Sequence, residues 1–384
     1  MIRVVLVEDS PTTREYLTSI LDGDPELRLV GTARDGSEGV QQVLSLRPDV
    51  VLMDVHMPRM GGYEATRQIM ERAATPIVLI SASFNAAEVA MTFQALEAGA
   101  LTVVEKPAGP GDPLADESAQ KLLQTLRLMA EVRVVHRWPR RNGSTGGATG
   151  PALTSGNDPT AVDGRSEQAH AILLPSRRTR LIAIGASTGG PNALSRILGA
   201  LPSAFDIPII VAQHITPGFV DGLADWLGQC TPMRVKIAES GEPLRGGTVY
   251  LAPADCHVGA GPGRIRLSNG PSDDGFYPSA TELFRSAALA YGPSAVGVLL
   301  TGMGRDGAAG LLAMRRVGAL TITQDRESCV VYGMPAEAVR LGAAQYVLSP
   351  EDISVLLGRV ARQRPGYDAP VPPSDALERP GSRP

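Results

Sequence analysis

The stretch Leu181–Pro191, which reads LIAIGASTGGP, constrains the fold of this chain more than any other. Its first four residues are apolar and stop at Gly185, which is typical of a buried strand in a parallel sheet. Ser187 and a glycine pair follow. Pro191 then suits the first turn of a helix, where its missing N–H would be unpaired anyway. The stretch therefore predicts a strand, a tight turn and a helix, with a serine hydroxyl at the turn.

Three functions fit this turn when it is taken alone. Gly185 and Gly189 bracket Ser187 as G-x-S-x-G, a pattern that exposes a nucleophilic serine at the edge of a sheet. A glycine-rich turn before a helix can also bind phosphate through backbone N–H groups. This one lacks the Lys-Ser/Thr ending of a P-loop and the spacing of G-x-G-x-x-G. The third possibility is a serine that only caps the helix. The rest of the chain must decide between them.

Length and composition limit the class of protein. A chain of 384 residues suggests two or three domains, and the net charge of −4 gives no basic excess for nucleic-acid binding. No apolar run reaches about 18 residues, so no membrane insertion is expected. The three cysteines, Cys230, Cys256 and Cys329, are scattered and show no metal-ligand spacing. We therefore expect a cytoplasmic protein with reduced thiols.

Residues 1–106 alternate between apolar strands and amphipathic helices, as in a doubly wound parallel sheet. The clearest strands are expected at Val4–Val7, Val50–Met53, Ile77–Ile80 and Leu101–Val104. Function gathers at the carboxyl ends of such strands. The residues found there are Glu8, Asp9, Asp54, Ser81 and Lys106. Three converging carboxylates favour a hard cation such as Mg²⁺, and a hydroxyl and an ammonium facing them suit a phosphoryl group.

This stretch resembles the response-regulator receiver family over its whole length. The resemblance implies a flavodoxin-like domain in which Asp54 accepts a phosphoryl group. It also implies that Glu8, Asp9 and Asp54 hold Mg²⁺, and that Ser81 and Lys106 contact the phosphoryl group. One departure is Val103, at a position where receivers usually carry an aromatic switch residue. The departure puts the aromatic switch in doubt, although not the acceptance of phosphate.

The sequence divides into four segments: a receiver at 1–122, a linker at 123–178, a second domain at 179–362 and a disordered tail at 363–384. A helix opening near Asp116 carries an apolar stripe at Leu122, Leu126 and Met129, which we expect to contact the second domain. From Pro139 to about Gln168 the chain has hardly any apolar clusters and is expected to be a flexible tether.

A nucleophilic serine in the second domain would need a base, and the base a carboxylate to fix its tautomer. His214 directly follows the predicted strand Ile207–Gln213, just as Ser187 follows its own strand. His257 lies a few residues beyond a predicted strand and is the weaker candidate for the base. For the carboxylate, Asp306 lies in a glycine-rich loop after the most apolar strand. Its rivals are Asp255, Asp325 and Glu327.

Several long motifs of this domain resemble the catalytic domain of chemotaxis protein-glutamate methylesterases, the CheB family. They are IGASTGGP, PIIVAQHI, VYLAPADCH, VGVLLTGMGRDGAAG and TQD…VVYGMP, and they span nearly all of 179–350. The resemblance implies a parallel α/β domain in which Ser187 is the nucleophile, His214 the base and Asp306 its orienting acid. It also implies an oxyanion site formed by Thr188 and the backbone N–H of Met303.

The resemblance further implies the reaction and its control. The chain would hydrolyse glutamate methyl esters on chemoreceptors, releasing methanol, and would deamidate specific glutamines, without a cofactor in this domain. A CheA-type histidine kinase would phosphorylate Asp54 and so uncover the triad. Two departures, at Tyr277–Glu282 and at Gly318-Ala319, are expected not to touch the triad.

Two alternatives stay open from the sequence. The second domain could bind a ligand or partner without catalysis, or it could be an esterase of a signalling array outside chemotaxis. The sequence shows no helix-turn-helix signal, so an output through transcription is not expected.

Overall fold

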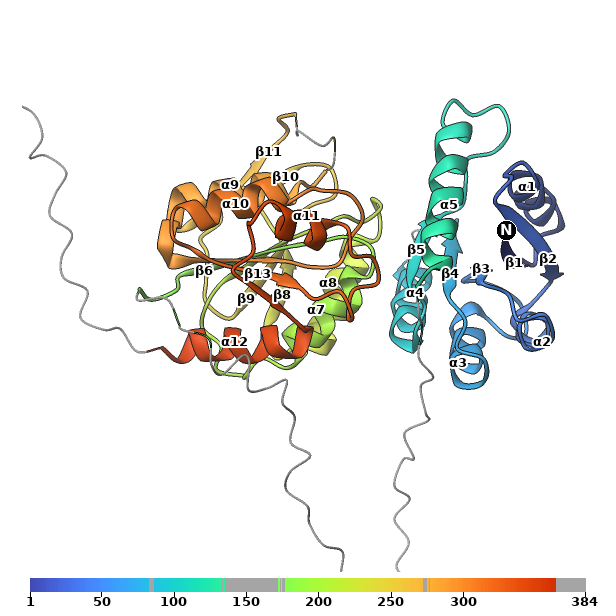
Figure 1. Ribbon diagram of the computed structural model, residues 1–384, viewed down its shortest axis with the longest axis horizontal. Coiled ribbons are helices and arrows are strands. Elements are labelled where there is room, and N and C mark those ends of the chain that lie inside the picture. The colour runs from blue at the N-terminus through green and yellow to red at the C-terminus, as the bar shows by residue number, and fades with distance from the viewer. Residues whose placement is uncertain are drawn as a thin grey trace, which may run out of the picture.

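The computed structural model describes residues 1–82, 86–132, 177–271 and 277–363, together with residues 134, 172, 174 and 275. This part of the chain forms two α/β units, each with a parallel sheet covered by helices on both faces (Figure 1). The predicted tether at 139–168 and the tail after residue 363 lie outside the described residues. Within the described ranges, no helix is long and apolar enough to cross a membrane.

The N-terminal unit is a five-stranded sheet in the order β2-β1-β3-β4-β5, which is the flavodoxin-like order. Its helices alternate with its strands, so the predicted doubly wound receiver is confirmed. The elements are β1 (Ile2–Val7), α1 (Pro11–Asp22), β2 (Leu27–Ala33), α2 (Gly36–Leu46), β3 (Val50–Asp54), α3 (Gly62–Arg72), β4 (Ile77–Ser81), α4 (Ala86–Ala98), β5 (Thr102–Glu105) and α5 (Ala115–Ala130).

The C-terminal unit contains a seven-stranded parallel sheet in the order β14-β13-β12-β6-β7-β9-β8, and a separate hairpin, β10-β11. Its elements are β6 (Leu181–Ala186), α7 (Gly190–Gly199), β7 (Ile209–Gln213), α8 (Val220–Cys230), β8 (Arg234–Ile237), β9 (Thr248–Leu251), β10 (His257–Gly261), β11 (Arg264–Ser268), α9 (Ala280–Tyr291), η2 (Gly292–Ser294), β12 (Ala295–Leu299), α10 (Ala308–Arg316), β13 (Leu320–Gln324), α11 (Met334–Arg340), β14 (Tyr346–Leu348) and α12 (Pro350–Arg362).

The central strands of this sheet are buried on both faces, which explains their uninterrupted apolar runs. On one face, Ile182 and Ile184 pack in the same cluster as residues of α7, α8 and α12. On the other face, Leu181 and Ala183 pack in the same cluster as residues of α9, α10 and α11. The stretch LIAIGA therefore forms a central strand, β6, and the chain leaves it at the carboxyl edge of the sheet.

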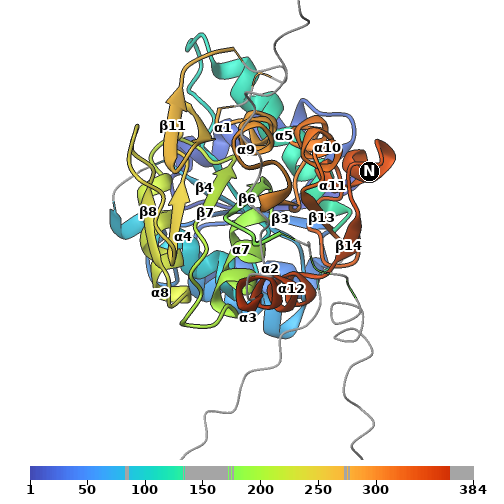
Figure 2. The same cartoon turned by 90° about the vertical axis from the view of Figure 1, so that its left-hand side faces the viewer.

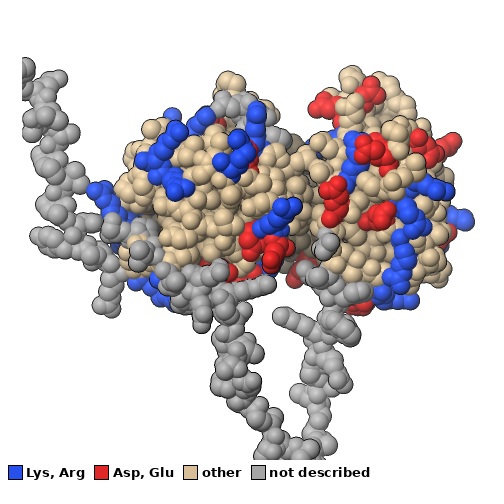
Figure 3. Space-filling view, viewed as in Figure 1, with Lys and Arg blue, Asp and Glu red and all other residues tan. Residues whose placement is uncertain are grey.

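The two units meet through α4 of the receiver, which packs against α8 and α7 of the C-terminal unit (Figure 1). Phe93 of α4 is fully buried and stacks on Trp226 of α8, with ring centroids 5.3 Å apart. The amide of Asn192, in α7, donates a hydrogen bond of 3.1 Å to the carbonyl of Leu96. Viewed along the line that joins the units, they overlap almost completely (Figure 2). In the space-filling view they touch as two lobes (Figure 3).

The predicted role of the α5 stripe is wrong. Leu122, Leu126 and Met129 are buried in the receiver's own core, with Leu17 and Leu21 of α1 and one face of the receiver sheet. Because α5 continues to Ala130, the boundary expected at residue 122 falls inside a receiver helix. Helix α4 contacts the second unit instead, and Val330 and Val331 of that unit pack against this receiver cluster.

Candidate active site

The carboxyl edge of the receiver sheet gathers the predicted phosphorylation residues. Glu8, Asp9 and Asp54 each offer a carboxylate oxygen, and these atoms lie within 4.8 Å of one another. Lys106 Nζ lies 2.9 Å from Glu8 Oε2 and 2.8 Å from Asp54 Oδ2. Ser81 ends β4 at the same edge, and its carbonyl accepts a hydrogen bond from the Lys106 backbone N–H. All five residues are therefore brought together.

The electrostatics of this cluster suit a divalent cation. Burial raises the pKa of Asp54, and the hydrogen bond from Lys106 offsets this only in part. Burial also raises the pKa of Glu8, and the charge of Asp54 adds to that effect. The single ammonium of Lys106 thus faces the carboxyl groups of Glu8 and Asp54, and both of these have a raised pKa. A hard cation with oxygen ligands would relieve that repulsion, so the three acidic residues fit Mg²⁺.

In the second unit, a tight turn places Ser187 directly after β6. The Ser187 backbone N–H donates to the Thr301 carbonyl, and its own carbonyl accepts from the Gly190 N–H at 2.7 Å. Gly189 has a φ of 78°, which favours glycine, and α7 begins at the next residue. The predicted strand, turn and helix are confirmed. The serine is half-buried at the carboxyl edge of the sheet.

His214 lies beside this turn because β6 and β7 are neighbouring parallel strands. Ala186 pairs with Gln213 in the strand register, and the His214 N–H donates to the Ala186 carbonyl. The side-chain amide of Gln213 donates to the carbonyls of both Ser187 and His214, at 2.8 and 2.9 Å. The two backbone segments are therefore tied together at this edge.

Asp306 pairs with His214. Its Oδ2 lies 2.8 Å from His214 Nε2, and its side chain is fully buried. The N-terminus of α9 surrounds the carboxylate with donors: the backbone N–H groups of Ala280 and Thr281, at 2.7 and 2.9 Å, and the Ser279 hydroxyl at 2.9 Å. Burial opposes ionisation of Asp306. The hydrogen bonds from His214 and Thr281 outweigh it and hold the pKa of Asp306 below its usual range.

The structure separates Asp306 and His214 from the rival candidates. Both ring nitrogens of His257 are occupied, by the Gly270 carbonyl and the Ser279 backbone N–H. His257 lies beyond β9, as expected, and is the first residue of β10. Asp325 Oδ1 accepts from the Ser328 N–H, which makes it a turn residue. Among the described contacts, Asp306 is the carboxylate that reaches His214.

The residues expected around an oxyanion lie next to Ser187. The hydroxyl of Thr301 donates to the Thr188 carbonyl at 2.9 Å. A methyl group on Gly302 would lie 2.6 Å from Ser187 Cβ, so only glycine allows the loop this close. Met303, half-buried, follows Gly302 in the same loop.

The residues that hold Asp306 differ from the sequence-based expectation. The stretch Tyr277–Glu282 was expected not to touch the triad, yet Ser279, Ala280 and Thr281 all bond to Asp306. Two sequence signals were available. Ser279 and Glu282 have the spacing of a capping box, and a helix N-terminus is a natural place for a carboxylate.

The comparisons with known proteins cover both units. Residues 4–115 match the model of the response regulator receiver domain, and residues 182–357 match that of the CheB methylesterase. A solved structure, the CheB methylesterase catalytic domain of Thermotoga maritima, is 38% identical and covers 47% of this chain and 98% of that chain, with a TM-score of 0.46.

Curated relatives match nearly the whole chain, and they are named protein-glutamate methylesterase/protein-glutamine glutaminase. That of Syntrophus aciditrophicus is 45% identical over 94% of this chain and 99% of its own length. The relative from Geobacter metallireducens is 43% identical over 95% of this chain and 100% of its own length. The relative from Nitrosospira multiformis is 44% identical over 95% of this chain and 98% of its own length. The chain therefore belongs to the family of protein-glutamate methylesterases/protein-glutamine glutaminases, in which a receiver domain is joined to a CheB methylesterase domain.

Proposed function

We propose that this chain is a phosphorylation-activated esterase that hydrolyses glutamate methyl esters on chemoreceptors and deamidates receptor glutamines. The observation that carries the proposal is the pair His214 Nε2–Asp306 Oδ2 at 2.8 Å, beside a serine on a tight turn at the same sheet edge. A serine that only caps a helix would not need a histidine paired with a buried carboxylate next to it. The three free cysteines fit a cytoplasmic location, which is part of the proposal.

The proposed chemistry follows from which ring nitrogen of His214 faces Asp306. Asp306 occupies Nε2 of His214, so Nδ1 is the nitrogen that takes the proton from the Ser187 hydroxyl. The serine oxygen attacks the ester carbonyl, and the tetrahedral oxyanion is stabilised by Thr188 and the backbone N–H of Met303. Collapse of this intermediate expels methoxide, which takes the proton from Nδ1 and leaves as methanol.

The second half of the reaction restores the enzyme. Nδ1 of His214 removes a proton from water, which attacks the acyl-enzyme, and that proton then passes to the Ser187 oxygen as the glutamic acid product leaves and loses its own proton to solvent. Asp306 stays ionised throughout, because its donors hold its pKa below the usual range. Its charge stabilises the imidazolium that forms twice in each cycle. A glutamine side chain would react in the same way and release ammonia.

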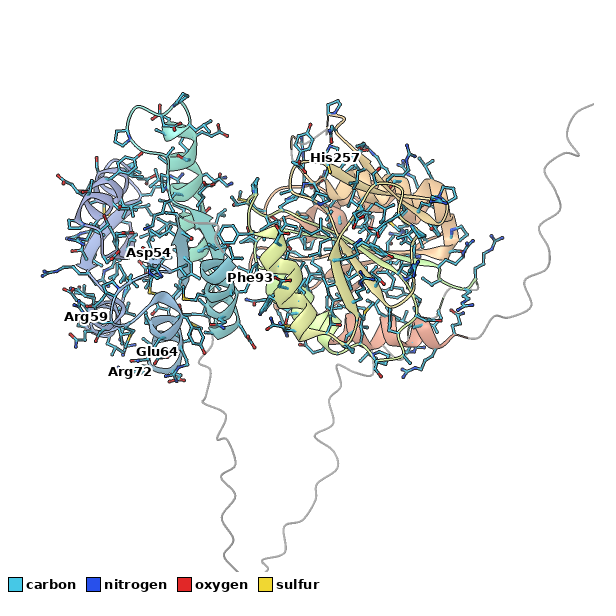
Figure 4. The ribbon with its side chains drawn as sticks, turned by 180° about the vertical axis from the view of Figure 1, so that it is seen from behind. Asp54, Arg59, Glu64, Arg72, Phe93 and His257 are labelled. Carbon is cyan, nitrogen blue, oxygen red and sulfur yellow. The ribbon has the colours of Figure 1, made fainter. Side chains whose placement is uncertain are left out.

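We propose that the receiver controls this site through its contacts with the second unit. Bound Mg²⁺, held by Glu8, Asp9 and Asp54, would neutralise charge on a phosphoryl group transferred to Asp54. Ser81 and Lys106 would then bind its oxygens, in place of the present contact between Lys106 and Asp54. Asp54 lies inside the receiver, away from the junction marked by Phe93 (Figure 4). The signal must therefore travel through the receiver to α4.

Two contacts support this coupling. Asn192, which bonds to Leu96 of the receiver, lies in α7, the helix that begins three residues after Ser187. Val330 and Val331 pack against the receiver core, while the carbonyl of Val331 accepts from Gly302 beside Ser187. A shift of the receiver would therefore act on both sides of the serine.

The test is methanol release from chemoreceptor membranes carrying labelled methyl groups, with acetyl phosphate and Mg²⁺ supplied. We expect release by the wild-type chain and none above background with Ser187→Ala. Equal release by both would refute the esterase and leave a binding module without catalysis. Release that depends on Ser187 but never on acetyl phosphate would refute the control by phosphorylation alone.

A further inference from the structure

We infer that His257 is a positioning residue for the reaction, acting on Asp306 through Ser279; this rests on the proposed function of the site. His257 is the first residue of β10 and its side chain is buried, with a relative exposure of 2%. Figure 4 shows it in the C-terminal unit, in the region of the hairpin β10-β11. No step of the proposed chemistry uses it, so its burial needs another explanation.

The hydrogen bonds of the ring fix its tautomer. Nε2 lies 2.9 Å from the Gly270 carbonyl, which can only accept, so Nε2 carries the proton. Nδ1 lies 3.1 Å from the Ser279 backbone nitrogen, whose N–H can only donate, so Nδ1 is unprotonated. Tyr277 stacks on the ring at a centroid distance of 4.5 Å and donates its hydroxyl to the same Gly270 carbonyl. The imidazole therefore presents Nδ1 as an acceptor aimed at the Ser279 N–H.

Ser279 is the point at which this acceptor acts on the site. It is the N-cap residue of α9, and its hydroxyl accepts from the Glu282 N–H while donating to Asp306 Oδ1. The next two N–H groups, of Ala280 and Thr281, donate to the same carboxylate. By accepting from the Ser279 N–H, His257 Nδ1 therefore holds in place the residue that orders three of the donors around Asp306.

A continuous chain of hydrogen bonds follows: Gly270 to His257, His257 to Ser279, Ser279 to Asp306, and Asp306 to His214. Removing the acceptor at Nδ1 would leave the Ser279 N–H buried without a partner, since Ser279 is only 1% exposed. The first turn of α9 would shift to find one, and the Asp306 carboxylate would move with its donors. A small displacement of an orienting group lowers the rate of the chemical step far more than substrate binding.

Three substitutions of His257 separate this role from simple packing. His257→Asn keeps an acceptor near the position of Nδ1 and loses the bond to Gly270. His257→Gln reaches the position of Nε2 and keeps the bond to Gly270, but presents no acceptor to Ser279. His257→Phe keeps the ring and its stack on Tyr277 and removes both bonds. Each variant is made in the full chain and assayed for methanol release with acetyl phosphate and Mg²⁺, with unfolding temperatures measured in parallel.

We expect kcat to fall on the order of 10- to 100-fold in His257→Gln and His257→Phe, with KM nearly unchanged and at least partial rescue in His257→Asn. Should His257→Phe not fold, the Asn and Gln variants still decide, because each loses one bond of the same side chain. Wild-type kcat in His257→Gln or His257→Phe overturns the inference, as does equal loss in all variants that fold. Ser187→Ala, run alongside, tests the proposed function itself: activity there refutes the esterase, whereas an inactive Ser187→Ala with a fully active His257→Phe refutes only the role of His257.

Discussion

The substitution Gly222→Ala should activate the unphosphorylated chain, because Gly222 of α8 faces α4 of the receiver. A methyl group at this position would overlap Val89 Cγ1, and it would lie 3.1 Å from Val89 Cβ and 3.4 Å from Phe93 Cε2. Carbon atoms in favourable contact are about 3.5–4.0 Å apart. Turning the Val89 side chain moves Cγ1 but leaves Cβ in place, so α4 and α8 must move apart by a few tenths of an ångström.

The size of the effect follows from the cost of overpacking. Inserting a methyl group into a packed contact costs about 1–3 kcal/mol. At about 1.36 kcal/mol for each factor of ten, the balance between docked and separated domains moves roughly 5- to 160-fold towards separation. Alanine is also a better helix former than glycine by about 1 kcal/mol, so α8 itself is not weakened. We expect basal methanol release to rise at least about 5-fold, up to the rate of residues 179–362 alone.

Gly228 provides a matched control in the same helix. A methyl group on Gly228 would meet no atom within 4 Å, so Gly228→Ala brings the same gain in helix propensity without touching the receiver. Both variants are compared with wild type in the methanol-release assay, without and with acetyl phosphate. Equal basal rates for folded Gly222→Ala and Gly228→Ala would refute the argument that the α4–α8 contact restrains the esterase.

Three further outcomes are expected. Ser187→Ala should lower the rate by about 10⁶ and Asp306→Asn by about 10⁴, with unchanged far-UV circular dichroism; near-normal rates would remove these residues from the reaction. Asp54→Ala should keep methanol release by the full chain slow even with acetyl phosphate and Mg²⁺, and chelation of Mg²⁺ should do the same to the wild-type chain. Residues 179–362 alone should stay fast in both tests. An isolated domain no faster than the unphosphorylated chain would refute inhibition by the receiver. Because the folded pKa of Asp306 lies below its ordinary value of 3.8, its contribution to stability is present above that pH and is lost as the pH falls through the folded value. Asp306→Asn should therefore lose less stability than wild type during acid unfolding below about pH 4, and identical acid transitions would contradict the assignment.

Much of the architecture could be predicted from the sequence, because apolar runs and their end points are local signals. The sequence predicts, to within a residue or two, the strands whose carboxyl ends carry Glu8, Asp54 and Ser187, and the parallel sheets follow from strand–helix alternation. Parallel strands end at a common edge, so the proximity of Ser187 and His214 was also predictable. The neighbouring register of β6 and β7 confirms it.

Other features depended on which distant segments pack together. The periodicity of α5 shows that Leu122 and Met129 are buried, but it cannot show against what, and they belong to the receiver core. Phe93 gives no pattern that marks it as a junction residue. The residues alone do not decide which of four acidic candidates pairs with His214, because each lies in a turn or loop that could bring it near the histidine. Tertiary packing selects Asp306, because it places the N-terminal N–H groups of α9 against this carboxylate. A sequence specifies which residues must leave water and where a strand must end, whereas the stabilisation of a buried charge depends on donors that only the folded chain assembles.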